Sequence, residues 1–283
     1  MGNKQLLAAA GAAVLLGMPA AHAADLGPPP PCTGPMAASP ACAPVVEVSG
    51  WYLRGDIGMS NQRISSIDNA GVNAGATVST PFLTFDSAPI FDVGVGYQIN
   101  SWLRVDATAE YRANAHFHGQ QVLTAPGIIL PDDYNASKNE WLFLANAYVD
   151  LGTWWNITPF VGVGIGTSRN TIQSFTDVGA TQVFGNTILS TTYGADKSKW
   201  NFAWAAYAGL AYQVTPTFTM EMSYRYLDLG SATTGPTNSF DGVTVVNGTP
   251  FVLKDLTSQD VRVGFRWMFL DSLPPPPPLM RRG

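Results

Sequence analysis

The chain has 283 residues, of which 12% are charged and 11% are aromatic, and its formal net charge is −5. The charged fraction is about half of the roughly 25% that soluble proteins carry, and the negative balance argues against nucleic acid as a partner. After the N-terminus, no segment has the roughly 18–20 consecutive apolar residues of a membrane-spanning helix. A membrane protein with this sequence would therefore be a closed β-barrel, because only helices and closed sheets satisfy every backbone polar group in lipid.

The first 23 residues have the three parts of a secretory signal peptide. Lys4 lies in a short polar start, an apolar run covers residues 6–16, and Ala21-His22-Ala23 precedes the expected cleavage site. The apolar run is too short to span a bilayer as an anchor. We therefore predict that residues 1–23 are removed and that the protein is exported.

Two proline-rich segments flank the central part of the chain. Residues 24–49 and 271–283 are expected to be extended periplasmic segments rather than parts of the folded domain. The only two cysteines, Cys32 and Cys42, lie in the first of these segments. In an oxidising periplasm they could form a disulfide, and without a nearby histidine they make a poor metal site.

Between these segments, residues 50–270 repeatedly alternate bulky apolar residues with small or charged ones. This period of two is typical of strands with one apolar and one polar face. The clearest case is the segment 103–112, in which Leu103, Val105 and Tyr111 share one face with two alanines. The pattern predicts eight strands, at about residues 51–60, 90–99, 103–112, 140–151, 161–166, 199–213, 218–226 and 261–269.

The connections between these strands alternate in length. Long polar segments follow the first, third, fifth and seventh strands, and short turns follow the second, fourth and sixth. The long segments are residues 61–88, 113–139, 168–198 and 230–257. Long loops at one end and short turns at the other are typical of outer-membrane barrels, with the loops outside the cell. An even number of strands then places both termini in the periplasm.

Alternation alone would also fit a soluble barrel with its apolar face inward. Eight strands, however, enclose only enough space for small side chains or one small ligand, and the apolar face carries large side chains on nearly every strand. Its aromatic residues also form two groups, as at the two interfaces of a bilayer. The turn-end group is Trp51, Trp102, Trp154, Trp155 and Trp267, and the loop-end group is Tyr111, Trp141, Trp200 and Tyr226. We therefore predict an all-β, eight-stranded antiparallel transmembrane β-barrel with four long extracellular loops and short periplasmic turns.

The opposite, inward face carries charges of both signs. In a narrow interior these charges must be paired, because a buried charge without its partner costs about 3–5 kcal/mol. We predict a network of ion pairs that plugs the interior, with a narrow or gated ion path as the alternative. The predicted network comprises Arg54, Asp56, Asp92, Arg104, Asp106, Glu110, Arg112, Glu221, Arg225, Arg262 and Arg266.

The loops offer one further pair of candidate ligands. His116 and His118 are two residues apart, so an extended backbone would point both the same way, and they could bind a metal or haem with Tyr134 or Asp132. A solvated polar loop is the favoured alternative. No nucleophile–histidine–acid arrangement can be recognised, so we predict no enzyme activity, no metal site and no cofactor.

Three of the strands resemble a known family. The segments are Trp51-Tyr52-Leu53-Arg54-Gly55-Asp56-Ile57-Gly58, Phe91-Asp92-Val93-Gly94-Val95-Gly96-Tyr97 and Glu221-Met222-Ser223-Tyr224-Arg225-Tyr226. They resemble strands of the small eight-stranded surface-antigen and porin-family barrels of Gram-negative outer membranes, similar to the outer-membrane protein A barrel. The resemblance covers about residues 50–270. In such barrels the chain usually ends at an aromatic residue of the last strand, whereas here fourteen residues follow Phe269.

The resemblance implies an outer-membrane protein involved in envelope integrity, surface antigenicity or, in some members, haemin binding. We predict a monomer with a structural, envelope-stabilising and surface-exposed role. Its expected partners are outer-membrane lipid, lipopolysaccharide and the barrel assembly machinery. The alternatives are a low-conductance channel, a haemin or other ligand receptor, and a periplasmic tether acting through the proline-rich tails.

Overall fold

The computed structural model describes residues 49–69, 77–126, 128–183 and 186–269. Among these residues the backbone forms thirteen strands, and no helix is long and apolar enough to cross a membrane. The predicted signal peptide, the proline-rich residues 24–48 with their two cysteines, and the tail 271–283 lie outside the described residues.

The strands follow one another with few interruptions. In chain order they are β1 (Gly50–Arg63), β2 (Ser66–Asn69), β3 (Thr77–Phe85), β4 (Ala88–Gln98), β5 (Leu103–Ala125), β6 (Ile128–Asp150), β7 (Ile157–Val183), β8 (Asn186–Gly194), β9 (Lys197–Gln213), β10 (Phe218–Thr233), β11 (Thr237–Phe240), β12 (Val245–Gly248) and β13 (Phe251–Met268).

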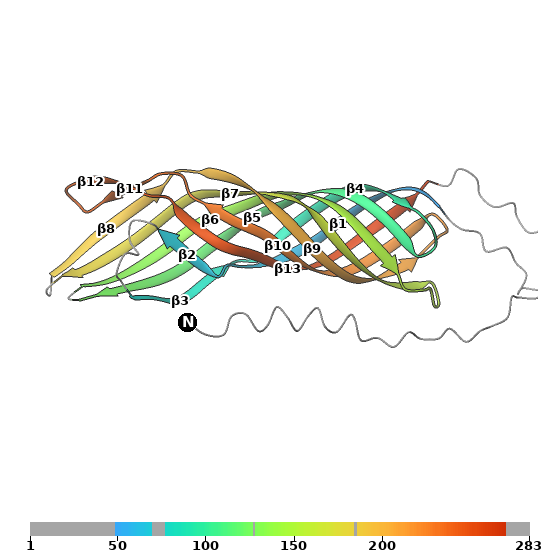
Figure 1. Ribbon diagram of the computed structural model, residues 1–283, viewed down its shortest axis with the longest axis horizontal. Helices are drawn as coiled ribbons and strands as arrows, with labels where there is room; N and C mark the ends of the chain where they lie inside the picture. Colours follow the sequence, from blue (N-terminus) through green and yellow to red (C-terminus); the bar gives the residue numbers. More distant parts are fainter. Residues whose placement is uncertain (1–48, 70–76, 127, 184–185, 270–283) are drawn as a thin grey trace, which may run out of the picture. The chain divides into compact units, whose positions relative to one another are not determined.

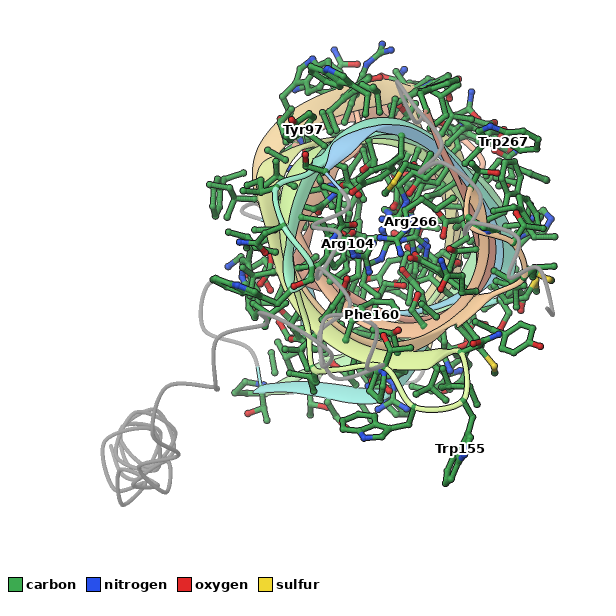
Figure 2. The ribbon with its side chains drawn as sticks, turned by 90° about the vertical axis from the view of Figure 1, so that its right-hand side faces the viewer. Tyr97, Arg104, Trp155, Phe160, Arg266 and Trp267 are labelled. Carbon is green, nitrogen blue, oxygen red and sulfur yellow. The ribbon has the colours of Figure 1, made fainter. Side chains whose placement is uncertain are left out.

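Eight of these strands form a closed ring. The antiparallel order is β7-β6-β5-β4-β1-β13-β10-β9, and β9 pairs with β7 from Ile157↔Tyr212 to Ile172↔Lys197 to complete the circle. Figure 2 shows this ring end-on. The connections β4–β5, β6–β7 and β9–β10 are short and lie at one end, on the right in Figure 1. The predicted eight-stranded antiparallel barrel is confirmed.

The part of the barrel between the two aromatic groups follows the predicted facing. We call it the girdled section; it comprises residues 50–60, 88–112, 140–168, 200–227 and 260–269. Its outward side chains are apolar and exposed, including Val93, Val163 and Phe202, and its inward side chains are mostly polar and buried. Inward glycines make room for large neighbours: a Cβ at Gly96 would lie 2.3 Å from the ring of Tyr52.

Beyond the girdled section the strands continue instead of giving way to irregular loops. The strands β5 and β6 each have 23 residues and β7 has 27, whereas about 9–11 tilted residues suffice to cross a bilayer. The short strands β2, β3, β8, β11 and β12 add to this part, at the left in Figure 1. We call it the extension; it comprises the described residues within 61–87, 113–139, 169–199 and 228–259. The connections are long, as predicted, but they consist largely of β-structure.

Irregularities in the strands mark the border between the two sections. The register of β5 against β6 shifts between Arg112 and Ala115, and that of β10 against β13 shifts around Gly230, whose φ is +74°. Ser174 in β7 and Asp255 in β13 also have positive φ, 52° and 51°. A bulge adds one residue to a strand and so exchanges its inward and outward positions.

The interior of the extension contains a hydrophobic core, beside which polar side chains such as Lys138 and Asp132 are also buried. Tyr134, Phe175 and Phe251 pack together, with the rings of Phe175 and Phe251 4.8 Å apart, and the rings of Phe85 and Phe117 are 5.0 Å apart. Buried aliphatic side chains complete this core, including Ile67, Ile172, Leu229, Leu253 and Leu256.

Candidate functional site: the charged barrel interior

The structure places all eleven predicted charges on the inner face of the girdled section. Ten of them are buried, and the side chain of the eleventh, Arg266, is 11% exposed. Figure 2 shows Arg104 and Arg266 inside the ring of strands, whereas Trp155 points away from it. The alternation of each strand, fixed by lipid on one side, is what directs these side chains inward.

Arg54 of β1 is at the centre of the group of charged side chains nearest the end with the short turns. Its guanidinium donates to both carboxylate oxygens of Asp56, at 2.9 and 3.0 Å, and to Asp106 Oδ2 at 2.8 Å. The nitrogen that contacts Asp106, Nη1, also donates to the hydroxyl of Tyr148 at 2.9 Å. The bidentate contact makes this a geometrically specific ion pair.

Arg104 of β5 crosses the interior at the same level. Its Nε lies 3.3 Å from Asp150 Oδ1 and its Nη1 lies 3.1 Å from Glu221 Oε1. Its guanidinium also stacks 4.3 Å from the ring centre of Tyr148 and 4.6 Å from that of Phe160. Carboxylates and aromatic faces thus surround a fully buried cation.

A second group surrounds Arg112 of β5, nearer the extension. Arg112 Nη1 donates to Glu110 Oε1 and Asp260 Oδ2, both at 2.9 Å, and its Nε lies 2.8 Å from Glu140 Oε2. Arg225 Nη2 donates to Glu110 and Asp260, each at 2.6 Å. Two arginines therefore share two carboxylates in the middle of the interior.

Arg262 of β13 joins the two groups. Its Nη2 lies 3.1 Å from Asp56 Oδ2 and 4.0 Å from Glu110 Oε2, and it forms a close ion pair with Asp92. The charged side chains therefore make one continuous network along the girdled section.

Sequence reasoning missed four charged members of this network. Asp260, Glu140, Asp150 and Lys138 are all buried and ion-paired. Asp260 lies on the same inward face as Arg262, but it comes one residue before the predicted start of that strand. Glu140 and Asp150 lie on the inward face of the predicted strand 140–151, and extending the alternation of the last strand by one residue would have found Asp260.

The two candidate haem ligands lie on the outer surface of the extension. His116 and His118 are exposed and share a face, and their Nδ1 atoms lie 3.2 Å from Ser137 Oγ and 2.8 Å from Asn135 Oδ1. The proposed co-ligands Tyr134 and Asp132 point to the inner face and are buried. A site that combines the histidines with either of them is therefore wrong, because the sheet separates them.

Within the described ranges, no group of three or more His, Cys, Asp or Glu side chains could hold a metal ion. In the charged network, each carboxylate forms an ion pair with at least one arginine or lysine. The charges of the interior therefore neutralise one another.

The fold and this interior define a small β-barrel of the outer-membrane type. The family model for the outer membrane protein beta-barrel domain matches residues 10–269, and the chain belongs to this family. It is 31% identical over 229 residues to a protein of Brucella suis biovar 1, covering 74% of this chain and 75% of that protein. It is 28% identical over 145 residues to the outer membrane protein PagN of Salmonella typhimurium, covering 49% of this chain and 56% of PagN.

Two further proteins are similar to this chain. A protein of Rickettsia typhi named as a candidate adhesin is 26% identical over 191 residues, covering 64% of this chain and 72% of that protein. The crystal structure of the outer membrane protein OprG from Pseudomonas aeruginosa matches with a TM-score of 0.44 and 14% identity, covering 79% of this chain and 98% of OprG. Family membership places the protein in the outer membrane of a Gram-negative bacterium.

Proposed function

We propose that this protein is a structural barrel of the outer membrane, with an interior closed by ion pairs and an extension displayed at the cell surface. The observation that carries the proposal is the burial of five arginine side chains, Arg54, Arg104, Arg112, Arg225 and Arg262. Each of these side chains is at most 4% exposed to water. An interior that barely admits water supports a plug rather than an ion path.

The same reasoning gives the orientation. The extension lies at the end with long connections, so it faces the outside of the cell, and the start of β1 and the end of β13 face the periplasm. The protein then contacts lipopolysaccharide where the outer half of the girdled section meets the membrane surface, and it needs no cofactor, nucleic acid or second copy. The absence of enzyme activity stays a prediction.

Conductance in planar lipid bilayers tests the plug. The wild-type barrel should give no steady, salt-dependent channels. Arg104→Ala should give measurable conductance, because it removes the side chain that fills the space between Tyr148 and Phe160. Arg63→Ala, which removes an exposed arginine of the extension, is the matched control and should stay closed. Steady wild-type channels would instead support the low-conductance alternative.

Deletion of the gene tests the envelope role. Cells without the protein should take up a hydrophobic fluorescent dye faster than the parent strain. The wild-type gene should restore the barrier, and the Arg104→Ala gene should restore it less completely. Equal dye uptake with and without the protein would contradict a structural role even if the barrel proves closed.

A second candidate function, attachment to another surface, is favoured by one patch of the extension. Neighbouring strands β8 and β11–β12 expose large apolar side chains to solvent, and β12 ends the path of paired strands. The exposed residues are Ile188, Leu189, Tyr193, Phe240, Val243, Val245 and Val246. Apolar patches of this kind mark interaction sites, and the similarity to a candidate adhesin agrees with this role.

Adherence measurements separate this candidate from the purely structural role. Bacteria that display a Val243→Ser/Val245→Thr/Val246→Thr variant should bind target cells or matrix less than bacteria that display the wild type. The same three changes should leave the membrane barrier intact, because all three side chains are exposed and lie outside the girdled section. Unchanged adherence would remove the candidate.

A further inference from the structure

Two buried carboxylates in the extension differ from every carboxylate of the charged network. Asp132 of β6 and Asp177 of β7 are 9% and 8% exposed and lie on the inner face. No ion pair joins either of them to a described lysine, arginine or histidine. Buried carboxylates are normally paired or coordinate a metal ion.

The strand register brings the two carboxylates together. Asp132 is opposite Gly179 and Asp177 is opposite Tyr134, so the two aspartates are diagonal neighbours on the same face. Gly179 lies opposite Asp132 and two residues after Asp177, and it leaves space beside Asp132: a Cβ there would lie 2.5 Å from Asp132 Oδ1 and 3.1 Å from Ser190 Oγ. The carboxylate of Asp132 and the hydroxyl of Ser190 therefore converge above this glycine.

The remaining neighbours add only neutral polar groups. Thr192 of β8 is opposite Asp177, and Gln121 of β5 is opposite Asp132; both are buried. The hydroxyl of Tyr134 donates to Gln121 Oε1 at 3.0 Å. The surroundings thus consist of two carboxylates, three hydroxyls and an amide, and oxygen ligands of this kind suit calcium and magnesium.

The side chain of Asp177 gives a second, independent observation that points to a bound cation. Its Oδ1 is buried without a hydrogen-bond partner, and its side chain lies on the same inner face as Asp132 and Gly179. Burial and the charge of Asp132 raise the pKa of Asp177 to about 8. Burial and the charge of Asp133 raise the pKa of Asp132 to about 6. Two negative charges at this place are costly unless a cation accompanies them.

We propose that Asp132 and Asp177 bind a divalent cation of the calcium type, with Ser190, Thr192 and Gln121 as neutral oxygen ligands. Calcium fits better than magnesium because it accepts six to eight oxygens in an irregular arrangement, whereas magnesium demands a near-ideal octahedron. The ion would tie β6 to β7 and β8 near the end of the extension, a role that does not depend on whether the barrel is closed.

The binding test uses the full protein in a nonionic detergent, freed of lipopolysaccharide and treated with EDTA. Terbium is the probe, because the buried ring of Tyr134 beside the site can sensitise its luminescence. Wild-type protein should give a luminescence signal that calcium displaces at lower concentration than magnesium. Absence of a signal, or a signal that calcium does not displace, would overturn the proposal.

Matched variants locate the ion. Asp177→Asn should weaken terbium and calcium binding by at least about tenfold, because affinity depends on the number of charged ligands. Asp133→Asn removes the same charge from an adjacent residue that is exposed on the outer face and hydrogen-bonded to Gln120, and it should change affinity little. Equal weakening by both variants would indicate general surface charge and contradict the site.

A stability measurement covers the case in which a variant folds poorly. Calcium should slow proteolysis of the wild-type extension, relative to EDTA, and should have no effect on Asp177→Asn. In EDTA, Asp177→Asn should resist proteolysis at least as well as the wild type, because it replaces a buried carboxyl group whose ionisation is unfavourable there. If calcium protects Asp177→Asn and the wild type equally, the assignment is wrong.

Discussion

The girdled section and the extension belong to one continuous barrel, yet on several strands they bury opposite kinds of side chain. In the girdled section, apolar side chains such as Val163 and Phe202 point outward and arginines point inward. In the extension, Phe117 and Phe175 point inward while His116 and Asn135 point outward. The solvent, rather than the strand, therefore decides which face is apolar, with lipid around the girdled section and water around the extension.

The bulges at the border make this inversion possible without breaking the sheet. On β5, even-numbered residues up to Arg112 point inward, and after the shift Ala115 and Phe117 do so. Without the extra residue, His116 and His118 would enter the core and Phe117 would face water. On β5 the inserted residue therefore exchanges a polar interior for an apolar one, whereas on β6 the even-numbered residues face inward in both sections.

The largest effect should come from breaking the network of the girdled section. Arg112→Met leaves Glu110, Glu140 and Asp260 without one of their cationic partners, so we expect unfolding to become easier by about 3–5 kcal/mol. Urea titration in lipid vesicles, followed by tryptophan fluorescence, measures the change. Arg63→Met, at an exposed position of the extension, should change stability by less than about 0.5 kcal/mol. Equal losses in the two variants would contradict the central role of Arg112.

A charge placed on the outer face should distinguish lipid from water directly. Val163→Lys, in the middle of the girdled part of β7, should cost about 2–4 kcal/mol because the ammonium would enter the bilayer. Thr176→Lys, on the outer face of the same strand in the extension, should be almost neutral. The same urea titration serves both variants. A mild effect at Val163 would mean that lipid does not surround this section.

The alternation in the sequence predicted the girdled section well because lipid imposes a strict rule on the outer face. The eight strands, the two aromatic groups and eleven inward charges could all be found from it. The predicted third and seventh strands end close to the bulges, at Arg112 and Tyr226, because a bulge reverses the parity that the pattern follows. The extension was therefore predicted as loops, although its residues continue the same strands.

The individual contacts of the interior could not be predicted from the sequence. Arg112 and Asp260 are 148 residues apart in the chain, and their ion pair depends on the closure of the ring. The pair Asp132 and Asp177 was missed for the same reason, since only the register of β6 against β7 brings these residues together. The period of two predicts whether a side chain points inward or outward, but it does not predict which side chain it contacts across the barrel.

The smallest expected effect concerns the apolar core of the extension. Ile172→Val removes one buried methylene, which should cost about 0.5–1.5 kcal/mol. The loss should appear as faster hydrogen exchange of β7 and β8 in the extension, with little change in the girdled section, because hydrogen exchange reports local opening and Ile172 lies in the extension. Ile165→Val makes the same chemical change seven residues earlier on this strand, where the side chain is 60% exposed on the outer face. It should leave exchange in the extension unaltered, since lipid fills the space of a lost methylene and a packed core does not. If Ile172→Val instead accelerates exchange equally along the whole of β7, the two sections unfold as one cooperative unit, and the inverted interiors are not independently stable.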